Sequence, residues 1–287
     1  MATLQQLKGR IKSIKSTSQL TKAMQTVAAI RYKKNSAKSK YAHKHLNQMK
    51  QLEQTLQGHL PQHDVFQSRP KATKTLLLIV GPTRGFCGGL HRSIPFAAYK
   101  SLKEDGIDPQ DSNQVEIITI NKPALKNVSR QGGTIYAAFL EITKDFDEYD
   151  ILALSELILK KYKEDKTIRT VKATFLTLDG KVTTETIFPL STKNNAEFDE
   201  NQRPEHDYRF DSSVEDIGEE LIHQYLQSFL NLAVIQTQTS EEKARMIAMN
   251  QATENAKKMN QALQLSFFRM RQAKITQEMN EIASNLS

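Results

Sequence analysis

The chain has 287 residues, a formal net charge of +8 and a single cysteine. One cysteine excludes an intramolecular disulfide and a metal cluster built on several cysteines. No stretch of the sequence offers the roughly 18 uncharged apolar residues that a membrane span needs.

The first segment, residues 1–60, predicts a long helix because residues 10–57 contain neither glycine nor proline. Its apolar side chains recur mostly at steps of three and four, which is typical of the seam of a coiled coil. The stripe consists of Leu4, Leu7, Ile11, Ile14, Leu20, Met24 and Val27. Such a narrow stripe requires a partner helix.

Charge is distributed unevenly along the chain. Residues 1–52 hold twelve Lys or Arg and no Asp or Glu, whereas the remainder has 28 basic and 32 acidic residues. This field favours an acidic partner, although the solvated face of a long helix would have the same composition. A basic coiled-coil protein that binds nucleic acid therefore stays open as an alternative, with Tyr32 and Tyr41 interleaved in the Lys-rich stretch 31–44.

The middle of the chain, residues 70–192, alternates strand and helix patterns. We expect strands at 75–80, 115–120, 134–139, 170–178 and 181–190, and helices at 93–104, 124–129 and 151–162. Asp179–Gly180 is a strong hairpin signal between the last two strands. The alternation predicts a Rossmann-like α/β domain with a small, mostly parallel sheet and an antiparallel edge. Residues 193–211 predict a polar loop.

A glycine-rich loop, GPTRGFCGGLH, follows the first predicted strand at residues 81–91. A loop between a strand and a helix can bind a phosphate. The glycine spacing, however, matches neither GxGxxG nor a P-loop, and no Lys-Ser/Thr follows. A small α/β enzyme would need such a phosphate loop, so we expect no catalytic residue, cofactor or metal site. Cys87 fits a small buried residue at a tight turn.

The last segment, residues 212–287, predicts a second long helix, since residues 219–287 lack glycine and proline. At about 1.5 Å per residue it would be roughly 100 Å long, too long for one compact core. Its apolar stripe contains one five-residue step: Met249, Ala252, Ala256, Met259 and Leu263, then Phe268, Gln272, Ile275, Met279, Ile282 and Leu286. Seams at opposite ends of the chain predict an antiparallel coiled coil, beyond which the longer C-terminal arm projects.

Three stretches carry a resemblance to a known family. RIKSIKSTSQLTKAMQTVAAIRYKK (10–34), ARMIAMNQATENAKKM (244–259) and RQAKITQEMNEI (271–282) resemble the N- and C-terminal signatures of gamma subunits of F-type ATP synthases. The glycine-rich loop resembles the family's DRGLCGG(L/F)N, with Thr83 for the usual Asp and His91 for the usual Asn.

This resemblance implies a non-catalytic rotor shaft. Its coiled coil would turn inside a ring of three alpha and three beta subunits that hold the nucleotide sites. The globular part would lie against the epsilon subunit and the membrane c-ring, with no nucleic acid bound and no membrane insertion. Because no targeting segment follows Met1, we expect a peripheral protein on the cytoplasmic face of a bacterial inner membrane.

Arg271 and Gln272 are polar residues in or beside an otherwise apolar stripe. From spacing alone, Gln272 is either a register-setting residue of a coiled coil or a contact with another protein. The resemblance implies that Arg271 and Gln272 contact a beta subunit, and we place Met24 and Ile275 in the same set. It also implies c-ring contacts for Tyr208 and Asp211.

Overall fold

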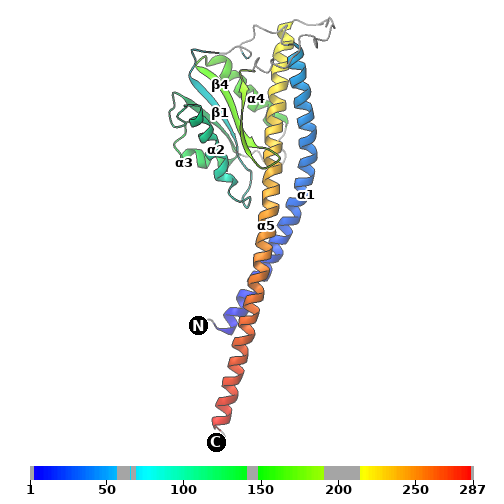
Figure 1. Ribbon diagram of the computed structural model, residues 1–287, viewed down its shortest axis with the longest axis vertical. Coiled ribbons are helices and arrows are strands. Elements are labelled where there is room, and N and C mark those ends of the chain that lie inside the picture. The colour runs from blue at the N-terminus through cyan, green and yellow to red at the C-terminus, as the bar shows by residue number, and fades with distance from the viewer. Residues whose placement is uncertain (1–2, 57–64, 66–68, 141–147, 191–213, 286–287) are drawn as a thin grey trace. The chain divides into compact units, whose positions relative to one another are not determined.

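The computed structural model describes residues 3–56, 65, 69–140, 148–190 and 214–285. The chain divides into two compact units. The helical unit comprises Met1–Arg31 and Glu242–Ser287, and the central unit comprises Tyr32–Glu241. Two long helices, α1 (Leu4–Leu56) and α5 (Val214–Asn285), contribute to both units (Figure 1).

The two long helices pair in both units. In the helical unit Thr21 contacts Thr253, Gln25 contacts Asn250 and Arg31 contacts Glu242, so the partner's number falls on α5 as the residue number rises on α1, and the pair is antiparallel. In the central unit His45 of α1 contacts Ser228 of α5. Together with the sheet described next, this pairing confirms the predicted fold class of a long antiparallel helix pair with a central α/β domain.

The sheet of the central unit has five strands in the order β3-β2-β1-β4-β5. They are β1 (Lys74–Val80), β2 (Val115–Ile120), β3 (Ile135–Phe139), β4 (Ile168–Leu176) and β5 (Val182–Phe188). Only the pairing of β4 with β5 is antiparallel, so the mostly parallel sheet with one antiparallel edge is confirmed. The hairpin between β4 and β5 closes where Gly180 adopts a φ of 82° and its N–H donates to the carbonyl of Thr177.

Helices cover both faces of the sheet. Those within the α/β part are α2 (Leu90–Glu104), α3 (Lys122–Arg130) and α4 (Glu148–Glu164). One apolar cluster joins α2 and α3 to the sheet, and a second joins α4, α5 and Leu46 of α1 to the other face (Figure 1). The central unit is therefore a three-layer α/β/α arrangement in which α5 forms part of one layer.

Strand β1 shows why its sequence is a continuous apolar run. Leu76 and Leu78 face the cluster with α4 and α5, whereas Leu77 and Ile79 face the cluster with α2 and α3. A parallel strand buried on both faces needs apolar side chains at every position, without alternation.

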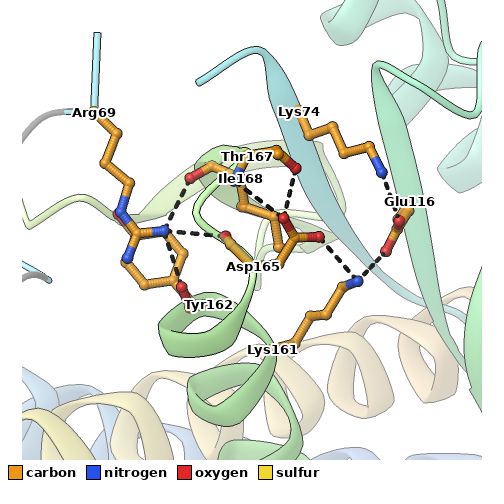
Figure 2. Close-up of polar contacts among 8 residues, drawn as sticks. All are labelled: Arg69, Lys74, Glu116, Lys161, Tyr162, Asp165, Thr167 and Ile168. Atoms are coloured by element: carbon orange, nitrogen blue, oxygen red, sulfur yellow. Dashed lines mark hydrogen bonds and ion pairs between the residues drawn. The ribbon is translucent and has the colours of Figure 1, made fainter. Parts of the chain in front are cut away.

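Arg69 stabilises the end of α4 (Figure 2). Its Nη1 donates to the backbone carbonyls of Tyr162, Asp165 and Ile168 at 2.9, 3.3 and 3.2 Å. Its guanidinium carbon also lies 3.8 Å from the centroid of the Tyr162 ring. Of these carbonyls, that of Tyr162 belongs to the last turn of α4, where carbonyls lack partners within the helix and a cation complements the helix dipole. The other two lie in the turn after α4 and at the start of β4, so Arg69 ties the helix end to the sheet.

An ion-pair chain continues from this helix end into the sheet (Figure 2). Lys161 Nζ lies 2.9 Å from Glu116 and 3.1 Å from Asp165, and Glu116 also binds Lys74 at 3.0 Å. The hydrogen bond from the Thr167 side chain, with a contribution from Lys161, lowers the pKa of Asp165 to about 2. Lys74 begins β1 and Glu116 is near the start of β2, so these ion pairs lie at the amino ends of the strands. Parallel α/β sheets bind ligands at the opposite, carboxyl ends of their strands. We therefore assign these ion pairs a structural role.

Candidate partner-binding surface of the helical unit

The seam of the helical unit follows a regular alternation of three- and four-residue steps on α5. From Met249 to Met270 its members are Met249, Thr253, Ala256, Asn260, Leu263, Phe267 and Met270, all buried or half-buried. Leu7, Thr21 and Ala28 are the most buried residues of the facing stretch of α1. Counting back from Thr21 opposite Thr253 places Leu4, the first residue of α1, near Met270.

Polar pairs lie in and beside this seam. The hydroxyls of Thr21 and Thr253, which lie in the seam and are buried, are 2.7 Å apart. Beside the seam, Gln25 Nε2 donates to Asn250 Oδ1 at 3.1 Å, and six residues further along α1 Arg31 lies 3.6 Å from Glu242. The buried Thr21–Thr253 pair favours one register of the helix pair, since a shifted pairing would leave its hydroxyls buried opposite other side chains.

We expect a double replacement to show that the Thr21 and Thr253 hydroxyls stabilise the chain through their contact with each other. Thr21→Val alone should destabilise the chain by about 1 kcal/mol, because it removes one hydroxyl from a buried pair. Thr21→Val with Thr253→Val should recover most of that loss, since two methyl groups pack in place of the two hydroxyls. Thermal melting of the single and double variants measures both effects. Additive losses in the double variant would show that the hydroxyls do not interact.

Several predicted seam residues are wrong. Leu20 and Val27 are 61% and 46% exposed, because the seam of α1 passes through Thr21 and Ala28, one position further along. On α5, Met259 is likewise exposed and Asn260 takes its place. In each case spacing selected the larger apolar side chain, whereas the helix pair buries a smaller or more polar neighbour at the closest approach.

The prediction that one seam runs from Leu263 to Phe268 through a five-residue step is also wrong, because the two residues belong to different stripes. The intramolecular seam continues through Phe267 and Met270, whereas Phe268 belongs to a second stripe that we call the outer stripe. The outer stripe has its own three- and four-residue steps: Leu265, Phe268, Gln272, Ile275, Met279 and Ile282. At 3.6 residues per turn its mean direction is about 120° from that of the seam.

The outer stripe is exposed along its whole length, and from Arg271 to Ser284 every residue of α5 is exposed. Positions 274 and 277, where the seam would continue, are Lys274 and Gln277. A longer α1 on the seam side would therefore leave the outer stripe uncovered. An exposed apolar stripe of this extent marks a surface for another protein.

The structure separates the predicted contact residues. Arg271, Gln272 and Ile275 lie together on the exposed end of α5, with Gln272 inside the outer stripe. Met24 is half-buried and sits at the level of Asn250, roughly 30 Å along the helix from Gln272. Tyr208 and Asp211 lie outside the described residues.

The glycine-rich loop of the central unit contains a contact that sequence reasoning missed. The carboxylate of Glu241, on α5, accepts hydrogen bonds from the backbone N–H groups of Thr83 and Arg84 at 2.8 and 2.9 Å. The Thr83 hydroxyl donates to the same carboxylate at 3.0 Å. No residue pattern in the sequence indicates this contact, because two of its donors are backbone N–H groups.

Cys87 is buried in the same loop, as predicted for a residue at a tight turn. Its Sγ lies 3.4 Å from the carbonyl of Arg84 and 3.5 Å from His91 Nε2. In the described part of the chain, no group of three or more His, Cys, Asp or Glu side chains is placed to hold a metal ion. Among the same residues, none of the helices combines the length and the apolar character needed to cross a membrane.

Comparison with known proteins agrees with this architecture. A family described as ATP synthase matches residues 3–287. An ATP synthase gamma chain from Chlorobaculum parvum is 27% identical over 289 residues, which covers 99% of this chain and 98% of that protein.

Two solved structures share the fold. A chain from the Euglena gracilis mitochondrial ATP synthase (OSCP/F1/c-ring, rotational state 3) gives a TM-score of 0.65 at 15% identity and covers 99% of this chain and 93% of its own. A chain from the rotor of the same enzyme in rotational state 1 gives 0.59 at 16% identity, with 95% and 98% covered. From the full-length family match and the gamma-chain relative, we conclude that this chain belongs to the gamma chains of the ATP synthase family.

Proposed function

We propose that this chain is the central rotor shaft of an F-type ATP synthase. It couples ion flow across the membrane to ATP synthesis or hydrolysis at sites on beta subunits, and it carries no catalytic residue itself. The observation that carries the proposal is the outer stripe: an exposed apolar surface on a single helix, turned away from the chain's own seam. The relatives' description as gamma chains and the neighbours' description as rotor and F1/c-ring parts support it.

In this proposal, a ring of alpha and beta subunits surrounds the helical unit. Rotation presents different sides of the shaft to each beta subunit in turn. A shaft changes the affinity of a distant site only through contacts that differ between rotational states. An outer stripe that occupies one side of α5 supplies such an asymmetry, because an apolar surface faces one beta subunit while a polar surface faces another.

The proposed beta-subunit contacts are Arg271, Gln272 and Ile275, with Met24 as a separate contact further along the shaft. Ile275 supplies apolar area, whereas Gln272 supplies a hydrogen-bonding group inside that area. We also propose that Tyr208 and Asp211 contact the c-ring and that the epsilon subunit binds nearby. The complex would sit on the cytoplasmic face of a bacterial inner membrane, with this chain held peripherally.

The basic face of α1 in the central unit fits an acidic protein partner. Lys33, Lys40 and Lys44 recur at steps of seven and four, so they share one face with the exposed Tyr41 nearby. Charged side chains at such spacing attract an acidic segment and raise its rate of association. We propose acidic segments of the surrounding ring as that partner.

Replacement of Gln272 by leucine tests the proposed role directly. The variant should fold and assemble normally, because it makes the outer stripe continuously apolar. If Gln272 makes a hydrogen bond to beta in some rotational states and loses it in others, its removal should lower turnover about fivefold. Arg271→Ala should have a similar effect. ATP hydrolysis and ATP synthesis by the reconstituted complex measure both.

Gln277→Leu is the matched control, since Gln277 is an exposed glutamine on the same part of α5 but outside the outer stripe. It should leave turnover unchanged. Full activity with Arg271→Ala and Gln272→Leu combined would show that the two residues do not transmit force. Failure of these variants to assemble would place them in the structure of the shaft instead.

A further inference from the structure

The carboxyl ends of β1 and β4 meet at the topological switch point of the sheet. From β1 the chain crosses to β2 on one side, and from β3 it returns to β4 on the other side. In open α/β sheets this point is where ligands bind, in the crevice between the two departing connections. Here the loop after β1, beginning at Gly81, and the hairpin after β4, beginning at Thr177, border that crevice.

Side chains of α5 occupy this crevice in the central unit. Ser240 Oγ donates to the carbonyl of Thr177, and Thr237 Oγ1 accepts from the backbone N–H of Leu176 at 3.1 Å. Glu241 reaches the loop after β1 and is 1% exposed. Three polar residues of one helix thus satisfy backbone groups at the ends of two adjacent strands.

The contact with Glu241 has the chemistry of an anion site. Two consecutive backbone N–H groups, of Thr83 and Arg84, point at one carboxylate, one to each oxygen. The Thr83 hydroxyl adds a third donor within 3.0 Å of both oxygens. Successive N–H groups that converge in this way form a concave site for anions in many proteins.

We propose that Thr83 and Arg84 form a carboxylate-binding site whose resident ligand is Glu241 of the same chain. The bound carboxylate fixes α5 to the switch point of the sheet at the last residue of the central unit. When the side chain of Glu241 is removed, the same N–H and O–H groups bind a free small carboxylate such as formate or acetate. The site itself is independent of the proposed rotor function.

Thr83 suits this ligand better than the aspartate that the DRGLCGG(L/F)N motif of gamma subunits has at the corresponding position. A threonine hydroxyl donates to the carboxylate, whereas an aspartate at the same place would bring a second negative charge to it. Thr83→Val removes this donor and keeps both backbone N–H groups. We expect it to weaken the fixation of α5 less than removal of the carboxylate does.

Chemical rescue of Glu241→Ala tests the site. The full-length variant should melt about 5 °C below the wild-type chain, because the N–H groups of Thr83 and Arg84 and the Thr83 hydroxyl lose an acceptor that is itself buried. Sodium formate or acetate should restore at least half of that loss, whereas sodium chloride at equal ionic strength should not. Glu254→Ala, which removes an exposed carboxylate from the same helix, is the control. Formate, acetate and chloride should change its melting temperature equally.

Glu241→Gln provides a second variant if Glu241→Ala does not fold. Its amide fills the crevice, so it should melt below the wild-type chain and show no specific response to formate. An unchanged melting temperature for Glu241→Ala, or equal formate and chloride effects on it, would overturn the carboxylate site. So would a formate-specific rise in the Glu241→Gln variant.

A measurement in the assembled complex tests the carboxylate site and the rotor proposal separately. The coupling effect expected in this measurement rests on the proposed rotor function, whereas the site itself does not. If α5 must be fixed to the sheet for force to pass through the central unit, Glu241→Ala should pump fewer ions per ATP hydrolysed, and formate should restore the ratio. Formate-dependent melting without any effect on coupling would keep the site and refute its role in the shaft. Loss of coupling without formate-dependent melting would refute the site.

Discussion

Replacement of Arg69 by methionine should destabilise the chain by about 3 kcal/mol, which is roughly 6–12 °C in melting temperature. Methionine keeps an unbranched apolar stem beside the Tyr162 ring but removes the guanidinium. The carbonyls of Tyr162, Asp165 and Ile168 then lose the donor that they share. The attraction of the cation to the aromatic face is lost as well.

Lys71→Met is the matched control, because Lys71 is an exposed cation two residues further along the chain. It should change the melting temperature by less than about 2 °C, as surface substitutions usually do. Arg69→Lys should recover only part of the loss, since one ammonium cannot reproduce the planar guanidinium over the ring. Equal melting of Arg69→Met and Lys71→Met would show that the cluster in Figure 2 contributes nothing specific.

The second large effect is expected at Gly81, the first residue after β1. A Cβ at this position would lie 2.6 Å from the Cβ of Ala124 and 3.1 Å from the carbonyl oxygen of Ile120. Both neighbours are in or beside rigid elements, so Gly81→Ala should destabilise the chain by about 3 kcal/mol through overpacking. Thermal or denaturant unfolding of the variant measures this loss.

Two further variants test the cause. Gly85→Ala lies in the same loop with no atom within 4 Å of the added Cβ, so it should have little effect. Ala124→Gly removes the closest contact and costs about 1 kcal/mol of helix propensity on its own. Combined with Gly81→Ala it should recover at least 1 kcal/mol relative to additivity, as contacting residues do. Strict additivity would mean that the two Cβ atoms never compete for space.

Local patterns along the chain predicted most of the fold. The apolar run in β1, the Asp179–Gly180 turn and the absence of glycine and proline from the ends each act over a few residues, so spacing and composition reveal them. Boundaries moved by a few residues: α2 begins at Leu90 because Gly89 and Gly88 precede it directly. Antiparallel pairing of the ends could be predicted because each helix has an apolar stripe too narrow for a compact core.

The exact faces of the helices could not be predicted from spacing. Spacing does not distinguish an apolar residue that contacts the other helix from one that contacts another protein, so it places Leu20 and Phe268 in the seam. The structure shows that Thr21 and Phe267 hold those places. Small and polar residues at the seam escape an apolar pattern, and the outer stripe becomes distinct only when the direction of the true seam is known.

Glu241 was missed for a different reason. Its partners are backbone N–H groups, which every residue other than proline carries, so the sequence of the loop does not record that they converge. Only the three-dimensional path of the loop after β1, together with the proximity of α5, brings the donors to one carboxylate. Sites built from main-chain atoms are the part of function that a single sequence encodes least visibly.

The antiparallel pairing has a consequence for the biosynthesis of the chain. Thr21 and Thr253 are 232 residues apart in sequence, so at about 5–20 residues per second the N-terminal helix leaves the ribosome roughly 10–50 s before its partner exists. During that interval the seam of α1, including Leu7 and Ala28, has no partner helix to cover it. We expect the twelve basic residues in 1–52, uncompensated by any acid, to repel neighbouring nascent chains during that interval and so to slow their aggregation.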